Sequence, residues 1–252
     1  MELKKKENKI IKRSGAKDDD IKYFLHLLPK DIKRVIEPFG GSFAISRRVY
    51  YADIYEKIVN DNDPSLFYAY KNINIIRDAN IFINELKDSK ILDSEIKKKV
   101  IEKYKDSPAL NYILQNNFIR GNIVKKCDIE KTYSNKNIDE MKKIQFCNED
   151  YKNIIEKYRN DKHAFIFLDP PYLFSNNSGY FAQSDETDMT DIIVYLLDLI
   201  KSKKTKCKIM LVINKLKILS YLFNGYIKME YHKIYQISKK GSYHLVITNY
   251  DL

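Results

Sequence analysis

The sequence predicts an α/β fold in which a mostly parallel sheet is built from alternating strands and helices. Two units of strand, turn and helix follow one another near the N-terminus, in RVIEPFGGSFAISRRVY and KIVNDNDPSLFYAYKNI. Such repetition is typical of a parallel sheet. A third unit, KIQFCNEDYKNIIEKY, resumes the alternation later in the chain. With 252 residues, of which 44% are hydrophobic, the chain is long enough to bury a large core.

The elements of the N-terminal part follow from hydrophobic spacing. A short first helix is predicted over residues 21–28, because its apolar residues share one helical face and Pro29 ends it. The two strand–turn–helix units then occupy residues 34–50 and 57–73. A Gly-Gly turn joins the strand to the helix in the first unit, and an acidic turn with Ser65 or Asp63 near the helix cap does so in the second.

The segment after this part breaks the alternation with charged helical stretches and the polar, aromatic run NYILQNNFIRGNIVKK. We interpret it as an inserted recognition region, so that the chain divides into residues 1–74, an insertion at 75–145, and residues 146–252. In the last part we expect strands at AFIFLDPPY and KIMLVIN, separated by a helix at TDMTDIIVYLLDLIK. Two closing strands are expected at YIKMEYHKIYQIS and SYHLVITNY.

The composition favours an anionic partner. The net charge of +11 points to nucleic acid, although lysines spread along the whole chain are explained about equally well as a solvated surface. The three cysteines and four histidines show no metal-ligand spacing, so no metal site is predicted. There is no signal-peptide core and no run of roughly 18 apolar residues. We expect a soluble protein, neither secreted nor membrane-bound, in a reducing compartment such as the cytoplasm.

Two of the predicted strand ends suggest a nucleoside-containing cofactor. Gly40 and Gly41 allow close approach of a ligand to the backbone and open a helix whose first N–H groups are unpaired. Asp61 closes the next strand 20 residues after Gly41, the distance at which dinucleotide-type folds place an acid for a ribose diol. Tight strand–helix packing and a helix cap are the structural alternatives. GGSFA is not GxGxxG, so a pyrophosphate cofactor such as NAD is not favoured.

The third strand end, FIFLDPPYLF at residues 165–174, carries groups suited to an amine on a flat ring. The Asp169 carboxylate and the Pro170 carbonyl can accept its two N–H bonds, and the Tyr172 ring can stack on the ring face. Pro170 and Pro171 hold these acceptors rigidly. A nitrogen activated in this way can attack a sulfonium methyl group directly, so no catalytic cysteine is needed. The structural alternative is a strand-ending turn with a buried tyrosine.

Taken in order, EPFGG, VNDND, DPPY and the near-terminal ITNYD resemble the Dam-type (D12 class) family of S-adenosylmethionine-dependent adenine-N6 DNA methyltransferases. The resemblance runs from Gly15 to the C-terminus. It implies a Rossmann-like fold with a mostly parallel seven-stranded sheet, one reversed strand, helices on both faces, and a smaller inserted helical or hairpin recognition domain. It also implies S-adenosyl-L-methionine as cofactor and double-stranded DNA with a target adenine as partner.

The resemblance carries site roles onto matching positions of this chain. It implies that the catalytic residues are Asp169, Pro170, Pro171 and Tyr172. The cofactor-binding residues that it implies are Lys17, Glu37, Pro38, Phe39, Gly40, Gly41, Asp61, Asp150 and Asp169. Lys17 corresponds to a lysine near the methionyl end of the cofactor, and Asp150 lies near its adenine.

DNA contacts are expected from the insertion. NNFIRGNIVKK is similar to a family stretch that precedes a hairpin, which makes Arg120, Asn122 and Lys125 the candidates. Arginine can pair with guanine and asparagine with adenine, while phosphate contact is about as good an explanation for the arginine. The glycines of the hairpin in GATC-specific members are not evident, so that target is not transferred. The paired adenine must flip out, and the loop 174–184 is suited to close over it.

Other interpretations stay open at this point. An RNA adenine-N6 methyltransferase would use the same DPPY chemistry, and a methyltransferase-like protein that only binds nucleic acid is a second alternative. A dinucleotide oxidoreductase has only the acid spacing in its favour. The basic leader, KKKENKIIKR, is either a phosphate grip or a solvated tail. A restriction endonuclease is compatible with the DNA interpretation as a functional partner.

Overall fold

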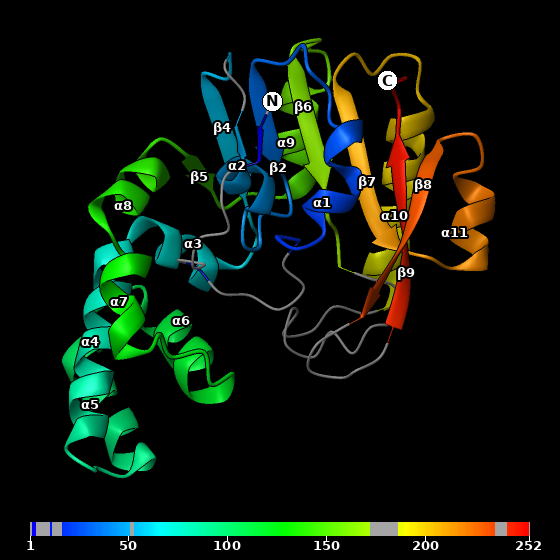
Figure 1. Cartoon of the computed structure of the whole chain (residues 1–252). Coiled ribbons are helices and arrows are strands. Elements are labelled where there is room, and N and C mark those ends of the chain that lie inside the picture. The colour runs from blue at the N-terminus through cyan, green and yellow to red at the C-terminus, as the bar shows by residue number, and fades with distance from the viewer. Residues whose placement is uncertain are drawn as a thin grey trace.

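The computed structural model describes residues 2–3, 11, 17–50, 53–171, 186–234 and 241–251 of the chain (Figure 1). Within these ranges the molecule has two parts, a layered α/β domain and a helical unit that stands to one side of it (Figure 1). The predicted alternation of strands and helices is confirmed in the first of these parts.

The α/β domain is built on a seven-stranded sheet. Its strands, in spatial order, are β5 (Gln145–Cys147), β4 (Glu56–Asn60), β2 (Arg34–Glu37), β6 (Ala164–Leu168), β7 (Lys208–Asn214), β9 (Gly241–Thr248) and β8 (Ile227–Ile234). The first five strands pair in parallel, whereas β9 pairs antiparallel with both of its neighbours. The expected mostly parallel sheet with one reversed strand is therefore confirmed. Strand β6 ends at Leu168, where Asp169 and the prolines begin.

Helices cover both faces of this sheet, because side chains alternate along the strands. On one face, Phe165 and Phe167 of β6 pack with α1 (Ile21–Phe24), the turn η1 (Leu25–Leu27) and α2 (Ala44–Arg48). On the other face, Ile166 and Leu168 pack with α9 (Tyr151–Tyr158), α10 (Glu186–Lys201) and α11 (Lys217–Leu222). The sequence did not predict α11 or the small antiparallel pair of β1 (Glu2–Leu3) and β3 (Val49–Tyr50).

The region between β4 and β5 is entirely helical. It contains α3 (Pro64–Lys71), α4 (Ile73–Asp88), α5 (Asp93–Tyr104), α6 (Leu110–Leu114), the π-helical turn η2 (Gln115–Ile119), α7 (Lys126–Thr132) and α8 (Asn135–Lys142). Every residue from 72 to 144 is described and none is in a strand, so the insertion takes the helical form of the expected helical or hairpin domain. The helical spacing of Ile73, Ile76 and Ile83 places all three in a core of this unit. The recognition role of residues 75–145 stays a prediction.

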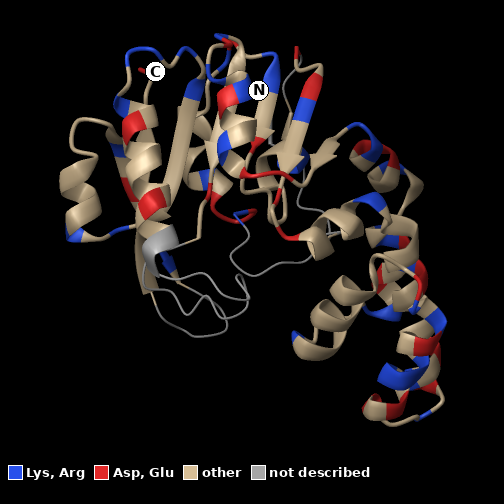
Figure 2. Ribbon diagram, turned by 180° about the vertical axis from the view of Figure 1, so that it is seen from behind, with Lys and Arg blue, Asp and Glu red and all other residues tan. Residues whose placement is uncertain are grey.

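Figure 2 shows both signs of charge mixed along the helical unit and acidic stretches in loops at one edge of the sheet. No helix among the described residues is long and apolar enough to cross a membrane.

Candidate active site

The predicted site residues of the α/β domain meet at the carboxyl edge of the sheet. Strand β2 lies between β4 and β6, with Glu37 opposite Val59 and Ile36 opposite Ile166. The segments that follow these three strands therefore leave the sheet side by side. Ligands of open α/β sheets bind at such an edge.

The glycine turn after β2 is packed against β4 on one side and open on the other. Gly40 N donates to Asn60 O at 2.7 Å, and a Cβ at Gly40 would lie 2.5 Å from Val59 Cγ1 and 2.8 Å from Asn60 O. Only glycine fits there without a shift. Gly41 has φ of +50°, and a Cβ built on it meets no atom of the described residues within 4 Å. The backbone at Gly41 thus borders space that a ligand can enter.

Asp61 and its neighbour Asn60 hold this turn in place. Gly41 N donates to Asp61 Oδ2 at 2.9 Å, and Asp63 N donates to Asp61 Oδ1 at 3.1 Å. The buried amide of Asn60 donates to Pro38 O and Glu149 O and accepts from Glu149 N, which ties together the ends of β2, β4 and β5. Sequence reasoning missed Asn60. The feature of the sequence that could have identified Asn60 is its position as a polar residue at the end of a buried strand.

Glu37 supports the helix that follows the turn. Its side chain is 2% exposed, and its carboxylate accepts from Ser46 N at 2.7 Å and Ile45 N at 3.3 Å, the first free N–H groups of α2. Burial raises the pKa of Glu37 to about 7, and the helix N–H groups oppose that rise. Glu37 therefore stabilises the start of α2, and through it the position of the glycine turn.

Aromatic rings flank the same edge near β5. The Phe39 and Tyr151 rings lie 5.0 Å apart, and Tyr151 makes an edge contact with Tyr195 at 5.7 Å. Asp150 caps α9 by accepting from Lys152 N at 2.7 Å. Sequence reasoning named Phe39 and Asp150 but missed Tyr151, the first residue of α9. Near the end of β5, the Phe39 and Tyr151 rings thus form an apolar surface, and the Asp150 carboxylate lies beside it.

Asp169 follows β6 directly and has a cation as partner. Lys17 Nζ lies 2.5 Å from Asp169 Oδ1, with the side chains 2% and 21% exposed respectively. Burial raises the pKa of the Asp169 carboxyl, and Lys17 opposes that rise. Pro170 is buried and Pro171 half-buried. Tyr172, the loop 174–184 and the lysines and arginine of the basic leader lie outside the described residues.

Asn214, which sequence reasoning also missed, ends the neighbouring strand β7. Leu168, the last residue of β6, pairs with Leu211, so Asn214 lies three residues beyond this pair at the same edge of the sheet, on the face that Phe167 and Val212 share. Its Oδ1 is buried and has no hydrogen-bond partner in the described part of the chain. The available signal was the strand KIMLVIN, in which five apolar residues are followed by a polar one at the end.

The candidate DNA-contact residues lie together in the helical unit. Arg120 follows η2, Asn122 donates from its backbone and side chain to Asn116, and Lys125 is exposed. Ile119 beside them is 75% exposed. In the described residues, no group of three or more His, Cys, Asp or Glu side chains is arranged to hold a metal ion.

Comparison with known proteins agrees with this geometry. A family model for the D12 class N6 adenine-specific DNA methyltransferases matches residues 14–240. The Type II methyltransferase M.CviBI of Paramecium bursaria Chlorella virus NC1A is 28% identical over 268 residues, which cover 96% of this chain and 99% of the relative. The match thus spans the sheet, the helical unit and the Asp169 segment alike.

Proposed function

Since the chain belongs to the D12 class of N6 adenine-specific DNA methyltransferases, we propose that its carboxyl edge transfers the methyl group of S-adenosylmethionine to the exocyclic amine of a target adenine. Site-specific methylation of DNA is its activity, in agreement with the type II relative. The methyl donor, the target base and the roles of single residues are the proposed part. The observation that carries the proposal is that Gly41, Asp61 and Asp169 follow three neighbouring strands.

The residues at the ends of β2, β4 and β5 fit a nucleoside-bearing methyl donor. Gly41 offers an open backbone, and Asp61 keeps acceptor capacity for ribose hydroxyls because each carboxylate oxygen has two lone pairs. Phe39 and Tyr151 supply apolar surface for a purine, with Asp150 beside them. When bound, the donor supplies a methyl group on a positively charged sulfur. Pro38, Gly40 and Glu37 contribute by holding the turn.

The residues after β6 act on the amine. The Asp169 carboxylate and the Pro170 carbonyl accept its two N–H bonds and so raise the nucleophilicity of the nitrogen. The nitrogen would bond to the methyl carbon while the carbon–sulfur bond broke with its electron pair going to sulfur, and the extra proton on the methylated nitrogen would pass to solvent. Lys17 holds Oδ1 of Asp169 and favours its ionised form, while Oδ2 remains as an acceptor. The proposed stacking surface is Tyr172.

The DNA partner is proposed to reach the helical unit through Arg120, Asn122 and Lys125. Arg120 and Asn122 can read base edges, and the exposed Lys125 can neutralise a phosphate. An adenine paired in duplex DNA must leave the helix before its amine can reach Asp169. The family match and the type II relative favour DNA over the RNA alternative.

The experiment that tests this function is methylation of mixed-sequence duplex DNA with S-adenosylmethionine, with RNA in parallel, followed by digestion to nucleosides and mass spectrometry. We expect N6-methyldeoxyadenosine from DNA alone. Methylated cytosine, or methylation of RNA alone, would contradict the proposed target. Binding of S-adenosylmethionine by calorimetry tests the donor separately, and no binding would contradict that part of the proposal.

A further inference from the structure

The turn before α1 carries four charged residues in a row, Lys17 to Asp20, and three of them are buried. Burying a charge is costly unless it is paired, so each buried side chain needs a partner. The turn itself is closed by Asp20 N and Ile21 N, which donate to Lys17 O at 2.9 and 3.1 Å. Lys17 and Asp20 are therefore held in a fixed relation by the backbone.

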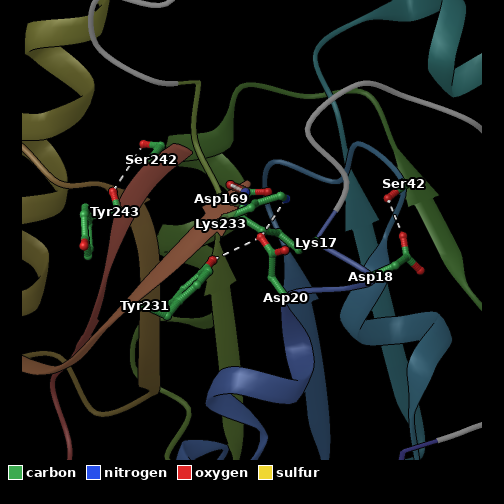
Figure 3. A network of polar contacts seen from close by, with 9 residues as sticks. All are labelled: Lys17, Asp18, Asp20, Ser42, Asp169, Tyr231, Lys233, Ser242 and Tyr243. Carbon is green, nitrogen blue, oxygen red and sulfur yellow. Dashed lines mark hydrogen bonds and ion pairs between the residues drawn. The ribbon is translucent and has the colours of Figure 1, made fainter. Parts of the chain in front are cut away.

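The three buried side chains find partners on three different parts of the sheet domain (Figure 3). Asp18 accepts from Ser42, beside the glycine turn, and from Arg47 of α2. Lys17 pairs with Asp169 after β6. Asp20, only 1% exposed, accepts from Tyr231 Oη at 3.1 Å and from Lys233 Nζ at 2.8 Å, both on β8.

Strand β8 does not neighbour β6, because β7 and β9 lie between them. Three strand spacings amount to roughly 14 Å. Lys233 and Asp169 lie on the same face of the sheet, and the turn bridges the distance between them. A displacement of Asp20 would be carried by the closed turn to Lys17 and from there to Asp169.

From these contacts we infer that Asp20 is a positioning residue for methyl transfer, acting with Lys233 and Tyr231 of β8 to hold Lys17 on Asp169. The inference rests on the proposed function of Asp169. It assigns to the β8–β9 hairpin a part in setting the geometry of the catalytic carboxylate, although Tyr231 and Lys233 are in none of the family motifs of the sequence.

The charges around Asp169 provide a way to test this positioning role, because they affect the pKa of its carboxyl in different directions. The charged groups that act on Asp169 are Lys17 and Asp20 from the turn and Lys233 from β8, and the same three act on His244 of β9, whose ring lies 5.1 Å from that of Tyr231. Asp20 raises the pKa of Asp169 and Lys233 lowers it. Burial lowers the pKa of His244 to about 4, so this ring is neutral at neutral pH. Removing Asp20 or Lys233 therefore shifts the ionisation of Asp169 in opposite directions.

The test compares Asp20→Asn and Lys233→Met with a matched control, Asp251→Asn. The control breaks the pair of Lys228 and Asp251, also 2.8 Å long, at the other end of β8, where Asp251 is fully exposed. Single-turnover methyl transfer is measured at saturating S-adenosylmethionine across pH, with donor affinity by calorimetry and folding by circular dichroism. Wild-type transfer that depends on Asp169 is established first, and its absence would overturn the proposed function itself.

Both site variants are expected to lose on the order of tenfold or more in transfer rate, with donor affinity and the control nearly unchanged. The acid limb of the pH profile moves to lower pH in Asp20→Asn and to higher pH in Lys233→Met. Lys233→Arg keeps the charge and restores most of the rate. Rates equal to the control, or loss without opposite shifts, would overturn the inference. If Asp20→Asn does not fold, the half-buried Lys233 supplies the same test through its Met and Arg variants.

Discussion

Lys17 Nζ and Asp169 Oδ1 lie 2.5 Å apart, although the two residues are 152 positions apart in the sequence. The pair joins the turn before α1 to the end of the central strand β6. Burial disfavours the ionised form of the Asp169 carboxyl and raises its pKa, and Lys17 offsets part of this effect. The acceptor strength of Asp169 thus depends on a residue outside the DPPY motif.

Replacing this lysine is expected to move the pH dependence of the reaction. In Lys17→Met the pKa of Asp169 rises further, because its nearest cation is gone. The ionised form is the one that accepts the amine N–H, so activity at acidic pH is lost at a higher pH than in wild type. Single-turnover rates across pH measure the shift. Lys162→Met, an exposed lysine before β6, is the control. An unmoved acid limb in Lys17→Met would refute the role.

The two adjacent glycines are expected to respond differently to alanine. In Gly40→Ala the new Cβ meets Val59 Cγ1 at 2.5 Å and backbone Asn60 O at 2.8 Å, so unfolding free energy falls by about 1–3 kcal/mol. In Gly41→Ala the methyl group enters open space at a φ of +50°, which costs about 1–2 kcal/mol in the backbone. That methyl also obstructs the donor, so donor affinity falls as well. Urea unfolding and calorimetry separate these effects, and unchanged donor affinity in Gly41→Ala would place the donor elsewhere.

Glu37 is expected to make the protein less stable as pH rises. Its pKa is raised from 4.5 to about 7 in the folded state, so between these values the folded chain binds a proton that the unfolded chain does not. Unfolding free energy therefore falls with rising pH across this window, by about 3 kcal/mol in all. Glu37→Gln removes this dependence, which denaturant titrations at several pH values measure. A variant whose stability follows pH as wild type does would contradict the assignment.

The candidate DNA contacts are distinguished by salt and by sequence. Lys125→Ala is expected to lower the affinity for all DNA sequences alike. It is also expected to reduce the slope of log affinity against log salt concentration by about 1. If Arg120 contacts a base edge, Arg120→Ala is expected to reduce the free energy of DNA binding by about 1–3 kcal/mol. Discrimination at that one base pair is then expected to relax. Fluorescence anisotropy with cognate and mismatched duplexes measures both. Affinities and slopes equal to those of Lys162→Ala would remove these residues from the interface.

The sheet was predictable from sequence because its signals are local. Each strand–turn–helix unit is a short stretch whose apolar spacing changes from a strand period to a helix period, and β2, β4, β5, β6 and β7 all form where that change indicates. The six-residue α11 buries only Leu219 within its length and leaves a weak periodic signal. The resemblance left a helical or a hairpin insertion open, and the structure forms helices there, with residues 120–125 as the connection between η2 and α7.

The polar contacts of the site were largely not predictable. Asp169, Gly41 and Asp61 stand out because each follows a buried strand and lies close to a proline, a glycine or another acid. The partners of the Lys17–Asp20 turn lie as far as 213 positions away, so that no spacing along the chain indicates them. Asn60 and Asn214 look like ordinary strand-ending residues until the register of neighbouring strands places them.

The most direct test of the account separates donor binding from methyl transfer at Asp169. Asp169→Ala is compared with wild type and with Asp198→Ala, an exposed acid on α10, by calorimetry with S-adenosylmethionine and by single-turnover methylation of duplex DNA. We predict that the variant binds the donor nearly as wild type does and forms no detectable N6-methyldeoxyadenosine. Methyl transfer by Asp169→Ala at a rate near that of Asp198→Ala would contradict the central claim.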